Sequence, residues 1–247
     1  MLSTTTTTKP SYQIRWEKLP EDYNLPNDPV DNINQPSLAT ALTESLIIAE
    51  KVSDKALISS NYGICATIND KIVVKAPDWA YIAQINVPRA EITRSYTPQL
   101  QGEIPLIVLE FLSDSDGGEY SVKETYPPGK FFFYEQILQV PNYGIFEPKT
   151  GVLEFYQLDE SKSSYQLQPG NQRYWIEEMQ LFLGVWQGNR ENRQGYWLRW
   201  WDEQDNLLMW GTEKIAQERQ RADQERQRAE RLAAQLRAMG IEPEDNK

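Results

Sequence analysis

The stretch Ile104-Pro-Leu-Ile-Val-Leu-Glu110-Phe-Leu-Ser113 places one carboxylate inside a long apolar run. A run this apolar is typical of a strand that is buried on both faces of a sheet. A charged carboxylate in such a strand is costly unless a cation, a set of N–H donors or a metal ion compensates its charge. We therefore expect Glu110 to lie in the middle of a sheet, beside a compensating group.

Two other segments supply partners for Glu110. Upstream, the strand-like Lys71-Ile-Val-Val-Lys-Ala-Pro-Asp78 ends in an acid. Downstream, Gly129-Lys130-Phe-Phe-Phe-Tyr134 brings a lysine into an aromatic segment that we expect to be helical over 130–139. Lys130 and Tyr134 would then share a helix face. Two carboxylates and a lysine on adjoining elements are the parts of a divalent-metal phosphodiesterase site. A buried ion pair that only supports the fold would use the same residues.

Composition narrows the chemistry. The 247-residue chain has a formal net charge of −11, 40% hydrophobic residues and no histidine. The absence of histidine excludes Ser-His-Asp and Cys-His catalysis and histidine-ligated zinc or iron. The acidic balance argues against a broad electrostatic grip on nucleic acid, but it is compatible with a local basic cleft. The lone Cys65 predicts a reducing compartment and a small buried side chain.

Targeting signals are not evident. The start, Met1-Leu-Ser-Thr-Thr-Thr-Thr-Thr-Lys9, has no apolar core of the kind that a secretory signal needs. No run approaches the roughly 20 apolar residues of a membrane span. We expect a soluble, cytoplasmic protein.

The pattern divides the chain into three regions: an extended arm over 1–36, a mixed α/β domain over 37–212 and a charged helical tail over 213–247. Ser37 is the expected N-cap of the first helix, and Asn69-Asp70 is the expected turn of a hairpin. The acids of the turn 114–119 are expected to be solvated. Strands are expected around 56–59, 62–68, 71–76, 143–146, 152–158 and 165–168.

Six of the eight tryptophans lie between residues 173 and 210. The segments Trp197-Leu-Arg-Trp-Trp201 and Leu207-Leu-Met-Trp210 flank Asp202-Glu-Gln-Asp-Asn206, which predicts a hairpin. Exposed aromatics at this density can bind sugars or bases. The alternative is that they cover a sheet edge or a dimer face.

The tail repeats itself after seven residues, since Gln217-Glu-Arg-Gln-Arg-Ala222 recurs as Gln224-Glu-Arg-Gln-Arg-Ala229. The repeat predicts a long helix that Gly240 ends. Glutamates in the heptad seam make a coiled coil weak, so a solvated helix with paired charges is the favoured structure. One seam position holds Ile215, Ala222, Ala229 and Leu236; the other holds Glu218, Glu225, Leu232 and Met239.

The order of these segments resembles the PD-(D/E)xK restriction-endonuclease-like superfamily. Within it, the chain resembles the restriction-endonuclease family, formerly a domain of unknown function, that is greatly expanded in cyanobacteria. The resemblance covers about residues 37–187. It implies an α/β fold with a mixed β-sheet core flanked by helices, here extended by the Trp-rich β segment and the helical tail. The residues that carry it are Ala76-Pro-Asp78-Trp, Val108-Leu-Glu110-Phe-Leu-Ser113, Lys130-Phe-Phe-Phe-Tyr134 and Val140-Pro-Asn-Tyr-Gly-Ile-Phe-Glu-Pro148.

The resemblance implies a metal-dependent endonuclease acting on DNA. Asp78 and Glu110 would hold Mg²⁺ (or Mn²⁺) with the main-chain carbonyl of Phe111, and Lys130 would serve the attacking water. Two further residues are implied as support: Glu44 as the acid of the first helix, and Tyr134.

Three positions depart from the family pattern. Leu112 stands where the simple motif has its lysine, so that Lys130 would take this role. Ser113-Asp-Ser-Asp116 replaces Ser-Pro-Ser-Thr, and Tyr126 replaces an acid. The departures keep open a second function, a non-catalytic interaction protein that retains the nuclease fold and assembles through its helical tail and Trp-rich face. With either function we expect a homodimer, formed through the Trp-rich segment or the helical tail. A carbohydrate-binding module built on the tryptophans is a third.

Overall fold

The computed structural model describes residues 12–18, 20, 34–113, 118–159, 161–170 and 173–240, and it builds the main sheet around the apolar run. Strand β6 (Ile107–Phe111) is central, and all five of its residues are buried, as expected. It pairs in parallel with β7, and the other neighbours in the sheet are antiparallel. The strand order is β2 (Leu57–Ser59), β5 (Trp79–Ile82), β6, β7 (Asn142–Glu147), β8 (Val152–Asp159) and β9 (Ser164–Leu167).

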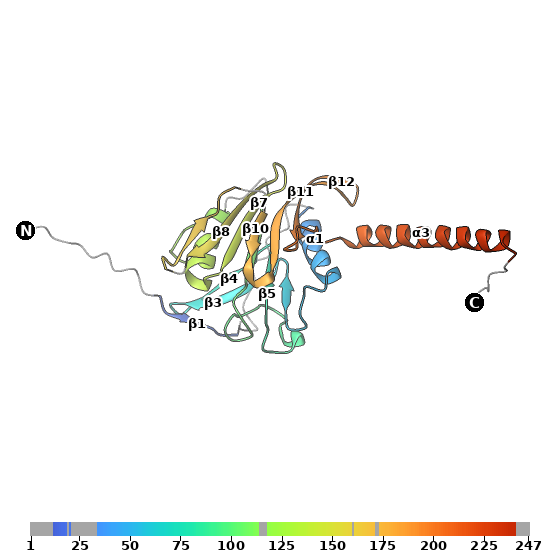
Figure 1. The fold of residues 1–247 in the computed structure, drawn as a ribbon. Coiled ribbons are helices and arrows are strands. Elements are labelled where there is room, and N and C mark those ends of the chain that lie inside the picture. Colours follow the sequence, from blue (N-terminus) through green and yellow to red (C-terminus); the bar gives the residue numbers. More distant parts are fainter. Residues whose placement is uncertain are drawn as a thin grey trace, which may run out of the picture.

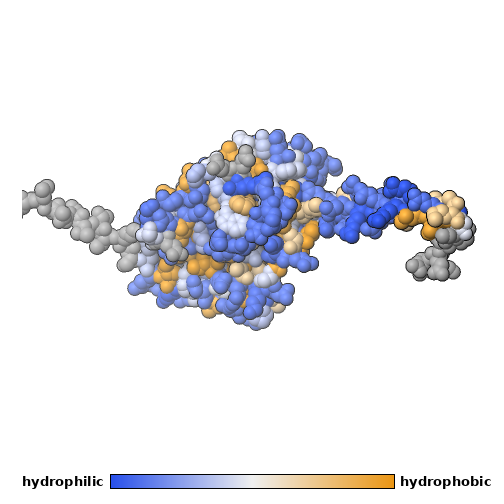
Figure 2. All heavy atoms as spheres, in the orientation of Figure 1, coloured by the Kyte–Doolittle hydropathy of each residue, from blue (hydrophilic) through white to orange (hydrophobic). Residues whose placement is uncertain are grey.

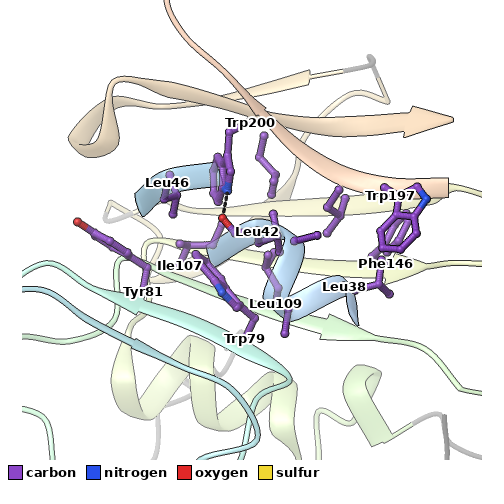
Figure 3. Packing of buried hydrophobic residues seen from close by; sticks show 14 of the residues in the cluster. Leu38, Leu42, Leu46, Trp79, Tyr81, Ile107, Leu109, Phe146, Trp197 and Trp200 are labelled. Atoms are coloured by element: carbon purple, nitrogen blue, oxygen red, sulfur yellow. Dashed lines mark hydrogen bonds between the residues drawn. The ribbon is translucent and has the colours of Figure 1, made fainter. Parts of the chain in front are cut away.

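One face of this sheet is covered by helix α1 (Asn34–Ile48). Its leucines meet Ile107 and Leu109 of β6 in one buried cluster (Figure 3). The helix begins before the expected N-cap, because Pro36 is tolerated in a first turn that needs no N–H donor. Ser37 therefore lies inside the helix, and its hydroxyl donates to Glu191 at 3.1 Å.

A second sheet covers the opposite side of α1. It consists of β10 (Arg173–Ile176), β11 (Leu181–Arg190) and β12 (Arg193–Trp201), all antiparallel, with the 3₁₀ turn η4 (Glu177–Met179) before β11. Trp200 donates its indole N–H to the carbonyl of Leu42 on α1 at 3.2 Å (Figure 3). The helix is thus held between two sheets.

The tryptophans of this region are mainly core residues. Trp197 and Trp200 are fully buried, and Trp201 and Trp210 are 5% and 1% exposed. The expected hairpin forms only in a short version: the antiparallel bridge Trp201–Leu207 and the hydrogen bond from the Leu208 N–H to the Trp200 carbonyl, at 2.9 Å, close the turn. The long strand partner of Trp197–Trp201 is instead β11. Because these four buried tryptophan rings pack in the interior, they cannot form the exposed surface that a carbohydrate-binding module needs.

The other face of the main sheet carries a second core. The small antiparallel sheet β1 (Ile14–Arg15), β3 (Ile64–Ile68) and β4 (Lys71–Lys75) packs there, with the expected turn at Asn69-Asp70 in positive φ. Cys65 is buried at 2% exposure, as expected. Short helical turns complete this side: η1 (Arg89–Glu91), η2 (Gly118–Tyr120), α2 (Lys130–Phe132) and η3 (Phe133–Leu138).

Helix α3 (Gly211–Ala238) extends away from the two sheets (Figure 1) and has no buried residue. It is a mostly hydrophilic rod (Figure 2), with charge pairs such as Lys214–Glu218 and Arg221–Glu225 at helical spacing. Gly240 follows in positive φ, so the helix ends where expected. Coiled-coil pairing, the homodimer and the three-region division stay predictions. Among the described residues, no helix is both long and apolar enough to span a bilayer.

Candidate active site

Glu110 is the centre of the site. It alternates with Leu109 and Phe111, which face α1, so its side chain shares the opposite face with Val108. The residue is 0% exposed. Its Oε2 accepts a hydrogen bond from Lys130 Nζ at 2.9 Å, and its Oε1 accepts one from Tyr134 Oη at 3.1 Å. The carboxylate is thus compensated by a cation and a hydroxyl, as a buried charge requires.

Asp78 lies immediately before β5, the antiparallel neighbour of β6. Its Oδ2 accepts a hydrogen bond from the main-chain N–H of Phe111 at 2.5 Å, and the residue is 8% exposed. This bond extends the β5–β6 ladder by a side chain. It places Asp78 at the end of β6 beside the residue that follows Glu110.

Lys130 and Tyr134 reach Glu110 from one short helical segment. Lys130 opens α2, and the chain then widens into the π-helical turn η3, so that the segment is helical over 130–138, close to the expected 130–139. The two side chains share a face, as four-residue spacing predicts. Single π turns are frequent at functional sites, because they re-aim side chains without ending the helix.

Glu119 joins these residues, although its turn was expected to be solvated. The residue is 8% exposed, and its Oε1 lies 3.7 Å from Lys130 Nζ. Its Oε2 is buried and has no hydrogen-bond partner among the described residues. Sequence reasoning missed it because an acid after two glycines has the pattern of a surface turn. Asp114 and Asp116, expected to be solvated in the same turn, lie outside the described residues.

Burial controls the electrostatics of the site. It raises the pKa of the Glu110 carboxyl to about 8, although Lys130 opposes the shift, and it raises the pKa of Asp78 to about 6 against the Phe111 N–H and Lys130. Burial also acts to lower the pKa of Lys130, but Glu110 and the other two acids outweigh it, and the net shift is upward. Lys130 is therefore an ammonium at neutral pH.

The carbonyl of Phe111 points to the same strand edge as its N–H, toward Asp78. It accepts a hydrogen bond from Nε2 of Gln35, in the first turn of α1, at 2.9 Å. Gln35 thus connects α1 to the end of β6. Sequence reasoning missed this residue, because a polar residue at a helix start carries no signal of a partner 76 positions away.

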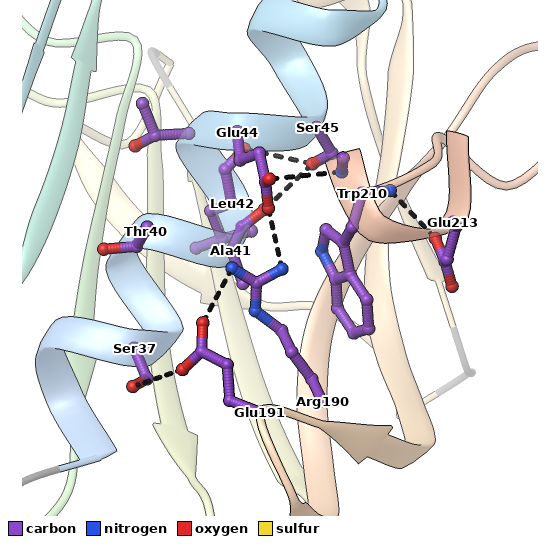
Figure 4. Close-up of polar contacts among 12 residues, drawn as sticks. Ser37, Thr40, Ala41, Leu42, Glu44, Ser45, Arg190, Glu191, Trp210 and Glu213 are labelled. Carbon is purple, nitrogen blue, oxygen red and sulfur yellow. Dashed lines mark hydrogen bonds and ion pairs between the residues drawn. The ribbon is translucent and has the colours of Figure 1, made fainter. Parts of the chain in front are cut away.

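Glu44 lies elsewhere, so the structure does not bring it to the site. Its Oε2 pairs with Arg190 Nη1 at 2.7 Å, and its Oε1 accepts the N–H of Gly211 at 3.1 Å. Figure 4 shows Arg190 between Glu44 and Glu191, on the side of α1 that faces the Trp-rich sheet. Glu110 faces the other side of the main sheet, which separates the two acids.

The donor set fits a hard divalent cation in its chemistry. Asp78, Glu110 and Glu119 offer carboxylate oxygens and Phe111 offers a carbonyl, the ligands that Mg²⁺ and Mn²⁺ prefer. The orphaned Oε2 of Glu119 is the observation that favours a ligand here. The acids are not held in coordinating positions, since no group of three or more Asp, Glu, His or Cys forms a preformed metal site in the part of the chain that the structure describes.

Comparison with known proteins identifies the family of the chain. The sequence model of the family Uma2, described as "Putative restriction endonuclease", matches residues 35–191, which include Asp78, Glu110, Glu119 and Lys130. A search of curated proteins finds no match to the chain. The match spans well over half of the 247 residues. The chain therefore belongs to the Uma2 restriction-endonuclease family and has a restriction-endonuclease-like α/β fold.

Proposed function

We propose that this protein is a metal-dependent endonuclease that hydrolyses phosphodiester bonds in DNA. The observation that carries the proposal is the meeting of Asp78, Glu110 and Glu119 with Lys130 at one end of β6, where burial makes their charges costly unless a ligand uses them. Family membership supports the reaction class.

Asp78 and Glu110, with the carbonyl of Phe111, would hold Mg²⁺ or Mn²⁺. When bound, such an ion polarises a phosphoryl oxygen and lowers the pKa of a coordinated water. The raised pKa values of both acids mean that protons compete with the ion for these oxygens. Glu119 is a third oxygen donor within reach of the same lysine.

Lys130 acts as a cation in this reaction. Its raised pKa keeps the amine protonated at neutral pH, so it cannot accept the proton of the attacking water. The ammonium instead stabilises the negative charge that grows on the phosphate oxygens as water adds to phosphorus and one P–O ester bond breaks, with the proton of the water ending on the oxygen that leaves. Tyr134 keeps Glu110 in position through its hydroxyl.

The test combines metal binding with cleavage. Calorimetry with Mn²⁺ and nicking of supercoiled DNA in Mg²⁺ or Mn²⁺ are measured for the wild type, Asp78→Asn and the control Glu91→Gln, which removes an exposed acid of η1. We expect Asp78→Asn to lose both binding and nicking and the control to keep both. Nicking that survives Asp78→Asn would refute the assignment, and RNA offered in parallel decides the nucleic acid.

A non-catalytic interaction protein is the competing function. The specific observation in its favour is that both oxygens of Glu110 are already engaged, one in an ion pair with Lys130 and the other in a hydrogen bond from Tyr134. This function predicts no measurable Mn²⁺ binding and no cleavage of any nucleic acid. The calorimetric experiment therefore separates the two.

A further inference from the structure

A second lysine, in the small sheet, lies on the Glu110 side of the main sheet. Lys75 is the last residue of β4, three positions before Asp78. Because side chains alternate along a strand, Lys75 shares its face with Val73, and its cross-strand neighbour is Ile64. Both apolar residues belong to the core cluster that contains Val108 and Tyr134, on the Glu110 side of the main sheet.

The charge of Lys75 is not used within the described part of the chain. The side chain is half-buried and has no hydrogen-bond or ion-pair partner among the described residues. Burial lowers its pKa, the ammonium groups of Lys130 and Lys123 lower it further, and Glu110 opposes the shift. The lysine therefore lies within electrostatic reach of the site without being neutralised by it.

Lys123 lies near Lys130 because the loop 123–129 is closed by a main-chain hydrogen bond. Its carbonyl accepts the N–H of Gly129 at 2.9 Å, which brings Lys123 next to Lys130 across the neck of the loop. The neck admits only glycine, since a Cβ at Gly129 would lie 2.0 Å from the carbonyl oxygen of Ser121. The side chain of Lys123 is exposed and free to meet a ligand.

The Glu110 side of the main sheet thus carries three lysines near three acids: Lys130 in contact with Glu110 and Glu119, and Lys75 and Lys123 near Lys130. When a divalent cation displaces the protons from the acids, three carboxylates, three ammonium groups and the ion together carry a charge of about +2. A chain of phosphodiesters is the anion that matches such a site, because it brings one negative charge per phosphate. The protein as a whole has a formal net charge of −11, so binding of nucleic acid must depend on a local group of positive charges.

We propose that Lys75 and Lys123 bind backbone phosphates of the nucleic acid next to the phosphate that is cleaved. The inference rests on the proposed function for the position of that central phosphate. A lysine ammonium is a compact point charge that suits this contact. Lys130 remains with the reacting phosphate, and the other two lysines set the path of the strand.

The experiment measures binding of a short labelled DNA duplex in Ca²⁺ at several salt concentrations. Lys75→Gln and Lys123→Gln are compared with Lys71→Gln, a matched control on the same face of β4. Lys71 is four residues from Lys75, roughly 13 Å along a strand, and it lies over the ring of Tyr126. Lys75→Arg tests rescue by charge, and melting curves verify folding.

We expect Lys75→Gln and Lys123→Gln each to weaken binding and to reduce the slope of log affinity against log salt by about 0.9. Lys71→Gln and Lys75→Arg should keep the wild-type slope. An unchanged slope in Lys75→Gln and Lys123→Gln overturns the inference, and so does an equal loss in Lys71→Gln, which would indicate only a general charge effect. A wild type that fails to bind the duplex overturns it as well.

Failure of the proposed function has a different signature. A wild type that binds the duplex with the expected dependence on Lys75, yet cleaves no nucleic acid in Mg²⁺ or Mn²⁺, refutes the nuclease and supports the phosphate contacts. Lys123→Gln keeps the test decisive if Lys75→Gln unfolds, because Lys123 is exposed and its substitution removes no core contact.

Discussion

The substitution Glu110→Gln should flatten the pH dependence of stability in metal-free protein. The pKa of Glu110 rises from 4.5 in the unfolded chain to about 8 in the folded protein, mainly by burial. Between those values the folded protein binds one proton more than the unfolded chain. Stability therefore falls as pH rises through this window and levels off above about pH 8. Glutamine has no such proton to lose and still meets Lys130 and Tyr134 with polar atoms.

The magnitude follows from linkage. From about pH 6 to about pH 8, a group with these two pKa values costs the folded state on the order of 2 kcal/mol. Asp78 adds little in this window, because its folded pKa of about 6 puts most of its effect at lower pH. For a chain of this length, about 2 kcal/mol corresponds to about 4–8 °C in Tm.

The assay is thermal and urea unfolding in a chelating buffer across the same pH range. Wild type, Glu110→Gln and the exposed-acid control Glu91→Gln are compared, so that the general acidity of the chain cancels. We expect wild type and control to lose stability together as pH rises, while Glu110→Gln loses about 2 kcal/mol less. Parallel curves for all three proteins would refute the reasoning, because Glu110 would then titrate as an ordinary acid in the folded state.

Two further predictions concern contacts on either side of the main sheet. Tyr134→Phe removes the hydroxyl that donates to Glu110 Oε1. We expect this substitution to cost about 1–3 kcal/mol of stability, to lower the rate of DNA cleavage and to weaken Mn²⁺ binding in calorimetry. Unchanged Mn²⁺ binding would contradict a positioning role for Tyr134. Glu213→Ala leaves the fully buried Arg199 without the carboxylate that it contacts at 2.6 Å. We expect the free energy of unfolding in urea to fall by about 3 kcal/mol and proteolysis at the base of α3 to become faster. The exposed control Glu230→Ala should change neither.

Local pattern determined the centre of this protein. The apolar run around Glu110 encodes a strand buried on both faces, because every side chain in it prefers the interior regardless of its partners. The turn at Asn69-Asp70 and the solvated helix α3 follow from local conformational preference and from charge spacing in the same way. The pairing of Glu110 with Lys130 could also be predicted from the sequence, because a buried carboxylate needs a compensating group.

Contacts between distant segments decided the rest. Glu44 was expected at the site and instead holds Arg190, 146 residues away, because α1 is covered on one side by the Trp-rich sheet and turns Glu44 toward it. Glu119 is buried because the fold closes over its turn, and Lys75 lies on the Glu110 side of the main sheet because the small sheet packs there. Burial of such polar residues depends on which surfaces pack against each other, and the sequence of a single strand or turn does not predict this packing.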